Sequence, residues 1–159
     1  MIFLTVGTHS QQFDRLLKKV DELVENKTIK EKVVAQIGNS TYKPRNYVFY
    51  KFIDERKMQN LYKNSEFVIL HGGVGSIITS LSYKKPTIVV PRLEKFNEHV
   101  NNHQLEISKA FESQHKVLVC YDIADLPRVI KKIHHFRPLV SKSKPKILSI
   151  VANFLNRME

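Results

Sequence analysis

A histidine followed by closely spaced glycines is the part of this sequence best suited to bind an anion. Residues 71–76, His-Gly-Gly-Val-Gly-Ser, follow the apolar run 67–70 and precede a segment with helical apolar spacing. Glycines let the backbone approach a ligand closely, and the first N–H groups of the next helix favour a phosphate or diphosphate. The segment matches neither a P-loop nor a dinucleotide fingerprint. Phosphate binding and an ordinary tight strand-to-helix connection therefore both stay open.

A second polar segment, residues 91–104, lies between an apolar strand pattern and a helix pattern. Nearly every side chain in it can hydrogen-bond, and its carboxylate, amide and imidazole groups suit a hydroxyl-rich ligand such as a sugar. The alternative is a polar helix N-terminus, in which Asn97 or Asn101 caps the helix and Glu98 favours its dipole. The residues alone do not decide between these two interpretations.

Apolar periodicity predicts an alternation of strands and helices that would position both segments. Strands are expected over 2–6, 33–37, 47–52, 67–70, 87–90 and 117–120, and helices over 13–24, 54–62, from about 76, over 100–111 and over 123–135. Such βα repeats predict an α/β fold, with a parallel sheet of about six strands and helices on both faces. Ligands bind at the carboxyl ends of such strands, where the polar loops converge.

The composition is that of one globular domain. The chain has 159 residues, 42% of them hydrophobic, which is enough for a core of its own. No window is long and apolar enough to span a bilayer, and the amino terminus reads as a first strand rather than a signal peptide. The single Cys120 excludes an internal disulfide. These features predict a cytoplasmic protein.

The charge narrows the possible partners. The 26 Lys and Arg residues against 15 Asp and Glu give a net charge of +11, which attracts nucleic acid, acidic membrane surfaces or nucleotide substrates. No nucleic-acid-binding motif is present, and the lysines are spread over many predicted helices. We therefore expect no nucleic-acid partner.

Several motifs together carry a resemblance to a known family. The segments 52–54 with Met58, Tyr62 and Ser65, 71–76, and 102–106 resemble, in order, the nucleotide-sugar-binding half of MurG-like GT-B glycosyltransferases. The opening residues 3–9, with Phe13 and Asp14, resemble the small catalytic subunit of the eukaryotic lipid-linked N-acetylglucosaminyltransferase. Bacterial capsule and exopolysaccharide glycosyltransferase subunits resemble the chain most closely, through 90–92, 98–99 and 103–104.

The resemblance implies a split enzyme. Residues 1–136 would form a Rossmann-like domain, the C-terminal half of a GT-B fold, which binds the UDP-sugar donor. A membrane-anchored subunit would bind the lipid-linked oligosaccharide acceptor and recruit this chain to the inner face of the cell membrane. The family reaction transfers the sugar with inversion and needs no metal or other cofactor, and the sequence has no Asp-x-Asp element. Capsule or exopolysaccharide biosynthesis is the implied pathway, with galactose as the favoured sugar.

The same resemblance assigns roles to individual residues. The backbone at 52–53 would contact uracil, and the 71–76 loop the diphosphate. Thr8 and His9 would face the diphosphate or the sugar, and the 98–104 segment the ribose or sugar hydroxyls. The complete predicted binding set is Gly7, Thr8, Phe52, Ile53, His71, Gly72, Gly73, Val74, Gly75, Ser76, Glu98, Asn102, His103 and Gln104. Many relatives bind ribose through a Glu three residues after the Ser76 position, where this chain has Thr79.

Three residues are candidates for catalysis. His71 could help the helix N-terminus to stabilise the departing UDP, or it could be a structural hydrogen-bonding residue. His9 and Glu98 are candidate bases within this chain. Because GT-B enzymes usually place the base on the acceptor half, we expect the partner to supply it.

The carboxyl-terminal residues 137–159 combine a basic connector with an amphipathic helical pattern. Its apolar face would dock on the membrane subunit or pack against its own domain. The exposed apolar surface expected of half an enzyme also allows a homodimer when the chain is isolated. The alternative function is a non-enzymatic protein that binds a nucleotide or a polyanion through its basic surface.

Overall fold

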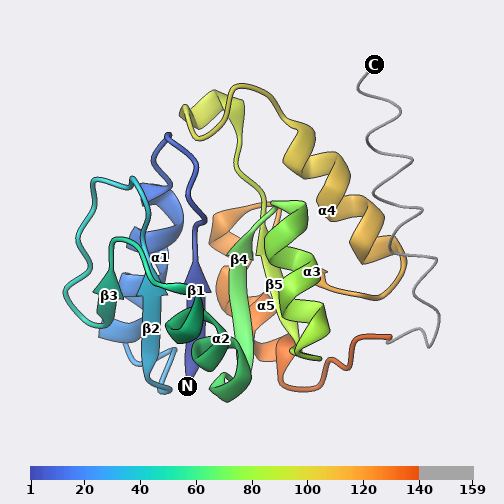
Figure 1. Cartoon of the computed structure of the whole chain (residues 1–159), viewed down its shortest axis with the longest axis horizontal. Helices are drawn as coiled ribbons and strands as arrows, with labels where there is room; N and C mark the ends of the chain where they lie inside the picture. Colours follow the sequence, from blue (N-terminus) through green and yellow to red (C-terminus); the bar gives the residue numbers. More distant parts are fainter. Residues whose placement is uncertain (140–159) are drawn as a thin grey trace.

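The computed structural model describes residues 1–139 of the chain, which form one α/β unit. Six strands and five α-helices follow one another along the chain (Figure 1). The strands are β1 (Ile2–Thr5), β2 (Val33–Gln36), β3 (Val48–Tyr50), β4 (Phe67–His71), β5 (Thr87–Val90) and β6 (Leu118–Val119). The α-helices are α1 (Asp14–Glu25), α2 (Glu55–Asn64), α3 (Val74–Ser82), α4 (His103–Ser113) and α5 (Leu126–Ile133), with short 3₁₀ helices η1 (Glu94–Phe96) and η2 (Ile123–Asp125).

All six strands form one parallel sheet in the order β3-β2-β1-β4-β5-β6. The chain builds the sheet from β1 towards one edge, then returns through α2 and builds from β4 towards the other edge. The central pair is in register from Ile2 opposite Phe67 to Thr5 opposite Leu70. The carboxyl ends of β1 and β4 therefore flank the point where the strand order reverses, the usual place for a ligand in such sheets.

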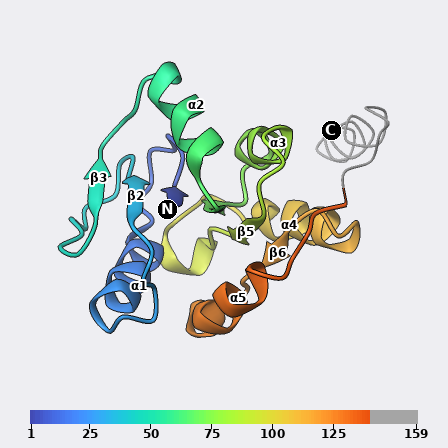
Figure 2. The same cartoon turned by 90° about the horizontal axis from the view of Figure 1, so that it is seen from below.

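Alternate strand residues face two separate hydrophobic clusters, one on each face of the sheet. In β1, Ile2 and Leu4 join the cluster covered by α1 and α5, whereas Phe3 joins the cluster covered by α2, α3 and α4. Figure 2 shows α1 and α5 on one side of the strands and α2 and α3 on the other. The predicted fold class, a parallel sheet of about six strands with helices on both faces, is confirmed.

Two helix starts differ from the prediction. We expected α4 to begin near residue 100, but it begins at His103, and η1 with several turns precedes it. Val100, the apolar residue expected to begin this helix, is 70% exposed and has no core to pack against, and the chain bends through residues 98–102 instead. Helix α3 begins at Val74 instead of near Ser76.

The connection between β2 and β3 contains no helix and is held against α1 by carboxylates. Asp14 accepts hydrogen bonds from the backbone and hydroxyl of Thr41 and from the backbone of Tyr42. Asp21, which is only 3% exposed, accepts hydrogen bonds from the Tyr42 hydroxyl and from the backbone N–H groups of Arg45 and Asn46. These carboxylates fix the loop that leads into β3.

None of the helices within residues 1–139 is long and apolar enough to cross a bilayer. The predicted division at residue 136 is not tested by the structure. Residues 140–159, where we predict most of the basic connector and the docking helix, lie outside the described part of the chain.

Candidate functional site

The loops that carry the predicted site residues all leave the carboxyl ends of strands. They are the β1–α1 loop (6–13), the β3–α2 loop (51–54), the β4–α3 connection (72–73) and the β5–α4 loop (91–102). In Figure 1 the β1–α1 loop and η1 of the β5–α4 loop rise together above the sheet. A hydrogen bond of 3.0 Å from Gln12 Nε2 to the Phe96 carbonyl joins these two loops directly.

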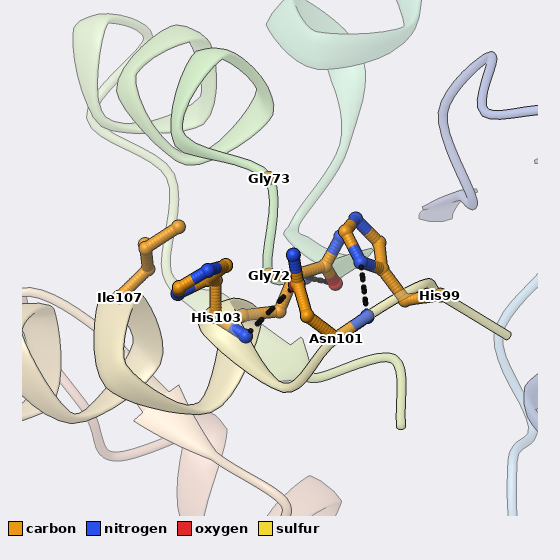
Figure 3. A pocket seen from close by; sticks show the side chains of 7 residues that line it. Gly72, Gly73, His99, Asn101, His103 and Ile107 are labelled. Atoms are coloured by element: carbon orange, nitrogen blue, oxygen red, sulfur yellow. Dashed lines mark hydrogen bonds between the residues drawn. The ribbon is translucent and has the colours of Figure 1, made fainter. Parts of the chain in front are cut away.

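A cavity of about 240 Å³ opens between the β4–α3 connection and the start of α4. Figure 3 shows His99, Asn101 and His103 around it, with Gly72 and Gly73 forming the opposite wall. The volume is below the roughly 300–1,000 Å³ typical of pockets that enclose a whole ligand. It can therefore hold only a part of a nucleotide sugar. The cavity is lined by Gly72, Gly73, His99, Asn101, His103, Gln104 and Ile107.

Helix α3 presents its N-terminus beside this cavity. Its N-cap is Gly73, no side chain caps its first turn within the described residues, and that turn contains no acidic residue. Helix α2 differs, because the Asp54 carboxylate accepts a hydrogen bond of 2.8 Å from the backbone N–H of Lys57. An uncapped helix N-terminus combines free N–H donors with the positive end of the dipole. It is suited to bind a phosphate group.

The side chain of Gln104 joins the two loops that border the cavity. Its Oε1 accepts hydrogen bonds from the backbone N–H of Gly72, at 2.9 Å, and of Arg92, at 3.0 Å. The added Cβ of an alanine at position 72 would lie 3.0 Å from the Gln104 carbonyl oxygen. Gln104 thus lines the cavity and also holds β4 and β5 in register just beyond their ends.

The imidazole of His71 lies between two glycines of different loops. A Cβ at Gly7 would approach His71 Cε1 to 2.5 Å, and a Cβ at Gly73 would approach His71 Nε2 to 2.4 Å. The ring is 8% exposed, and its Nδ1 has no hydrogen-bond partner among the described residues. Burial, followed by the positive charge of Arg92, lowers the pKa of His71 to about 4. His71 is therefore neutral at pH 7 and can act there through a hydrogen bond, not through a charge.

His9 and His99 stack on each other at the side of the cavity. Their ring centroids are 4.7 Å apart and their planes differ by 27°. His9 Nδ1 accepts a hydrogen bond from the backbone N–H of Gln11, which fixes the ring within its loop. Burial, followed by the neighbouring His99 and Arg92, lowers the pKa of His9. The predicted site residue His9 thus lies beside a cavity residue, although it comes from a distant loop.

The carboxylate of Glu98 makes structural contacts. It is fully buried and forms a two-pronged ion pair with Arg15 of α1, with both N···O distances 2.9 Å. Its Oε2 also accepts a hydrogen bond from the backbone N–H of Leu93. Its predicted roles, as a base and as a ligand of sugar hydroxyls, stay predictions, and Glu98 is not among the residues that line this cavity.

The loop predicted to contact uracil is positioned by a buried glutamine that sequence analysis missed. Gln36 Oε1 accepts a hydrogen bond of 3.1 Å from the backbone N–H of Ile53, and its Nε2 lies 3.5 Å from the Gly7 carbonyl. Phe52 is 50% exposed at the same place. Because the N–H of Ile53 is occupied, a base bound here would meet its carbonyl group.

The remaining predicted residues lie at the same edge of the sheet, and their binding roles stay predictions. Thr8 and Gly75 are exposed. The Asn102 side chain accepts a hydrogen bond from the backbone N–H of Glu94, which ties it to the β5–α4 loop. The Thr79 hydroxyl donates to the Gly75 carbonyl within α3.

Three cavity residues, His99, Asn101 and Ile107, were absent from the predicted site. His99 and Asn101 belong to the polar segment that sequence analysis singled out, so their residue types were a usable signal. Ile107 lies three residues after Gln104, which places it near the same face of α4. Within residues 1–139, no group of three or more His, Cys, Asp or Glu side chains could hold a metal ion.

Curated proteins that are similar to this chain include two mammalian transferase subunits. Over 136 residues the chain is 32% identical to the human protein named UDP-N-acetylglucosamine transferase subunit ALG13, covering 75% of this chain and 11% of that protein. The mouse protein of the same name is 32% identical over 130 residues. The chain thus spans about a tenth of the length of these curated relatives.

Solved structures share the fold. The solution structure of ALG13 has a TM-score of 0.60 at 18% identity and matches 91% of each chain. The glycosyltransferase of kitacinnamycin has a TM-score of 0.62 at 17% identity, covering 96% of this chain and 37% of that one. MurG of Acinetobacter baumannii has a TM-score of 0.57 at 17% identity, covering 83% of this chain and 40% of that one. These structures confirm the predicted likeness to one domain of a GT-B glycosyltransferase.

The family itself is shown by the sequence. The model of the glycosyltransferase family 28 C-terminal domain matches residues 1–158, which is almost the whole chain. This match confirms the resemblance that the sequence motifs indicated. The chain belongs to the glycosyltransferase family 28 C-terminal domain family.

Proposed function

We propose that this chain is the donor-binding catalytic subunit of a two-component inverting glycosyltransferase. It transfers a sugar from a UDP-sugar to a lipid-linked acceptor in capsule or exopolysaccharide biosynthesis, with galactose as the favoured sugar. The observation that carries this proposal is the uncapped N-terminus of α3 beside a polar cavity at the carboxyl edge of the sheet. Membership of a glycosyltransferase family supports it.

The chemistry follows from the charge that develops on the leaving group. The acceptor hydroxyl oxygen attacks the anomeric carbon, the bond from that carbon to the UDP oxygen breaks with its electron pair, and a base takes the hydroxyl proton. The N–H groups of α3 stabilise the negative charge that builds up on the diphosphate. Neutral His71, whose ring lies beside the N-cap residue Gly73, can add a hydrogen bond to the diphosphate. We assign the base to the partner subunit, because the buried Glu98 carboxylate is paired with Arg15.

The proposed partner is a membrane-anchored subunit that holds the acceptor and brings this chain to the inner face of the membrane. The relatives are named as subunits of a transferase, which supports a second subunit in the proposed enzyme. The same name mentions UDP-N-acetylglucosamine, so that donor competes directly with UDP-galactose as the substrate. The choice between them is open to direct measurement.

Calorimetric titration of the purified chain tests the proposal. We expect saturable binding of UDP that exceeds the binding of UMP and ADP, and a preference for one UDP-sugar when UDP-galactose and UDP-N-acetylglucosamine are compared. The variant Ser76→Asp places a carboxylate in the first turn of α3, where it favours the helix dipole but repels a diphosphate. It should lose UDP binding and keep its thermal stability.

The matched control is Ser82→Asp at the opposite end of the same helix, about 9 Å further along its axis than Ser76. It adds the same charge and should bind UDP as the wild type does. Equal affinities of the wild type and Ser76→Asp for UDP would contradict the placement of the diphosphate at α3. The alternative function, polyanion binding through the net charge of +11, predicts oligonucleotide binding that weakens steeply with salt and shows no preference for UDP.

A further inference from the structure

Arg92 is fully buried at the carboxyl end of β5, yet no carboxylate forms an ion pair with it among the described residues. Its guanidinium instead donates to four backbone carbonyl oxygens. Nη2 donates to Val6 at 2.7 Å, and Nη1 donates to Gln11 and Gln12 at 2.9 Å and to Glu98 at 3.0 Å. These four hydrogen bonds offset much of the cost of burying the charge, while Nε has no hydrogen-bond partner among the described residues.

The four carbonyl groups belong to two loops. Val6 stands at the start of the β1–α1 loop, and Gln11 and Gln12 stand at its end, so one guanidinium holds both ends of that loop. The Glu98 carbonyl belongs to the β5–α4 loop, which carries the cavity residue His99. Arg92 therefore joins the loop of Thr8 and His9 to the cavity.

A second set of hydrogen bonds also joins the amino-terminal part of the chain to the β5–α4 loop, and here the donor is on the amino-terminal side. Arg15 of α1 donates to the Glu98 carboxylate and to the Pro91 carbonyl. Because β4 lies between β1 and β5 in the sheet, the contacts of Arg92 and Arg15 pass over the end of β4. The end of β4 is His71, which explains why this imidazole is 8% exposed at the rim of an open sheet.

We propose that Arg92 is a positioning residue that fixes the β1–α1 loop against the β5–α4 loop, so that His9 stacks on His99 at the cavity. The proposal rests on the proposed function in so far as this cavity receives the donor. The planar fork of arginine is required, because a lysine ammonium cannot reach the carbonyl groups at both ends of the loop together.

A double-mutant cycle between Arg92 and His9 tests whether Arg92 acts through this loop. In the wild-type background, His9→Ala should weaken binding of the preferred UDP-sugar about tenfold, the change expected for a lost hydrogen bond to a charged group. In the Arg92→Gln background the same change should have little effect, because His9 is already displaced. Arg92→Lys should behave like Arg92→Gln. The control Arg128→Gln removes an exposed arginine outside the site and should match the wild type.

Equal effects of His9→Ala in both backgrounds, no effect of His9→Ala in the wild type, or full rescue by Arg92→Lys would each overturn the proposal. A ring-to-ring nuclear Overhauser effect between His9 and His99 gives a readout that needs no donor. It should be present in the wild type and absent in Arg92→Gln. If the wild-type chain does not bind UDP or either UDP-sugar, the proposed function is refuted, and this ring contact alone decides the role of Arg92.

The wild-type chain provides a measurement for the case in which the Arg92 variants do not fold. Four hydrogen bonds should hinder rotation of the Arg92 guanidinium and slow the exchange of its Nη protons, which nitrogen-15 NMR detects. The exposed Arg128 guanidinium, which makes a single ion pair of 3.1 Å with Asp125, provides the comparison and should exchange its Nη protons faster. Averaged, rapidly exchanging Nη signals from Arg92 would overturn the proposal.

Discussion

The contact between His71 and Gly73 leads to a prediction that separates packing from backbone strain. Gly73 has φ −76° and ψ 127°, an extended conformation that any residue adopts. A Cβ at this position would nevertheless lie 2.4 Å from His71 Nε2 and 2.9 Å from His71 Cδ2. The substitution Gly73→Ala should therefore destabilise the fold mainly through its contact with the imidazole, not through backbone strain.

The size of the effect follows from how little room the ring has. The ring cannot retreat from Gly73 without a shift elsewhere, because His71 Cε1 already occupies the space beside Gly7, 2.5 Å from where a Cβ would be. Forcing one extra carbon into a packed interior costs about 1–3 kcal/mol. We expect Gly73→Ala to lower the free energy of unfolding by that amount.

Urea denaturation followed by circular dichroism measures this loss in a double-mutant cycle. In a His71→Ala background the ring is absent, so Gly73→Ala should cost only the smaller loss of a favourable N-cap residue, and the difference gives a coupling energy of about 1–3 kcal/mol. The same unfolding curves show whether each variant remains cooperative. An equal cost of Gly73→Ala in both backgrounds would refute the packing argument.

Gly75→Ala is the matched control within the same glycine segment. A Cβ at Gly75 would meet no atom within 4 Å, and the residue lies in the first turn of α3. Alanine is the better helix former, so this change should stabilise the chain by up to about 1 kcal/mol. Opposite signs for the two glycines would show that their neighbours, not glycine itself, decide the outcome.

Two further predictions concern stability. The pKa of His71 is lowered to about 4 in the folded chain, so the unfolded chain binds the proton more readily, and stability should fall as the pH drops from about 6.5 towards 4. The slope from this group is at most about 1.4 kcal/mol per pH unit, and urea unfolding at several pH values should show it in the wild type but not in His71→Asn. Asp21→Ala should cost roughly 2–3 kcal/mol in the same assay, because the Tyr42 hydroxyl and the N–H groups of Arg45 and Asn46 lose their acceptor.

The fold could be predicted because every residue is buried in four of its six strands, β1, β2, β4 and β5. Every residue of β4 is buried, so the strand appears in the sequence as an uninterrupted apolar run. The start of α4 could not be predicted, because Val100 resembles a core residue in the sequence but is 70% exposed. Apolar spacing predicts a helix only where the apolar residues are buried, and burial at position 100 depends on a loop conformation that local sequence does not encode.

The convergence of the polar loops at the carboxyl edge of the sheet could be predicted from the sequence, but the structural roles of their individual side chains could not. The residues of the polar segment 91–104 left ligand binding and a structural helix N-terminus both open, and in the fold Arg92 and Glu98 are fully buried and Gln104 is 6% exposed. Buried polar groups are usually hydrogen-bonded. These three side chains form hydrogen bonds with backbone N–H or carbonyl groups of the site loops. Only the contacts of the folded chain reveal that role.

Other polar residues of the same loops are partly exposed. His9, His99 and Asn101 are partly accessible, and His99 and Asn101 line the cavity. Their side chains can therefore meet a ligand without first breaking a buried contact of the kind that Arg92 makes. A sequence motif can contain both kinds of residue, those that contact a ligand and those that hold the loop in place, because losing either kind weakens binding. Burial separates the two: Arg92 holds its loop through buried contacts, and the contact of His9 and His99 with a ligand stays a prediction.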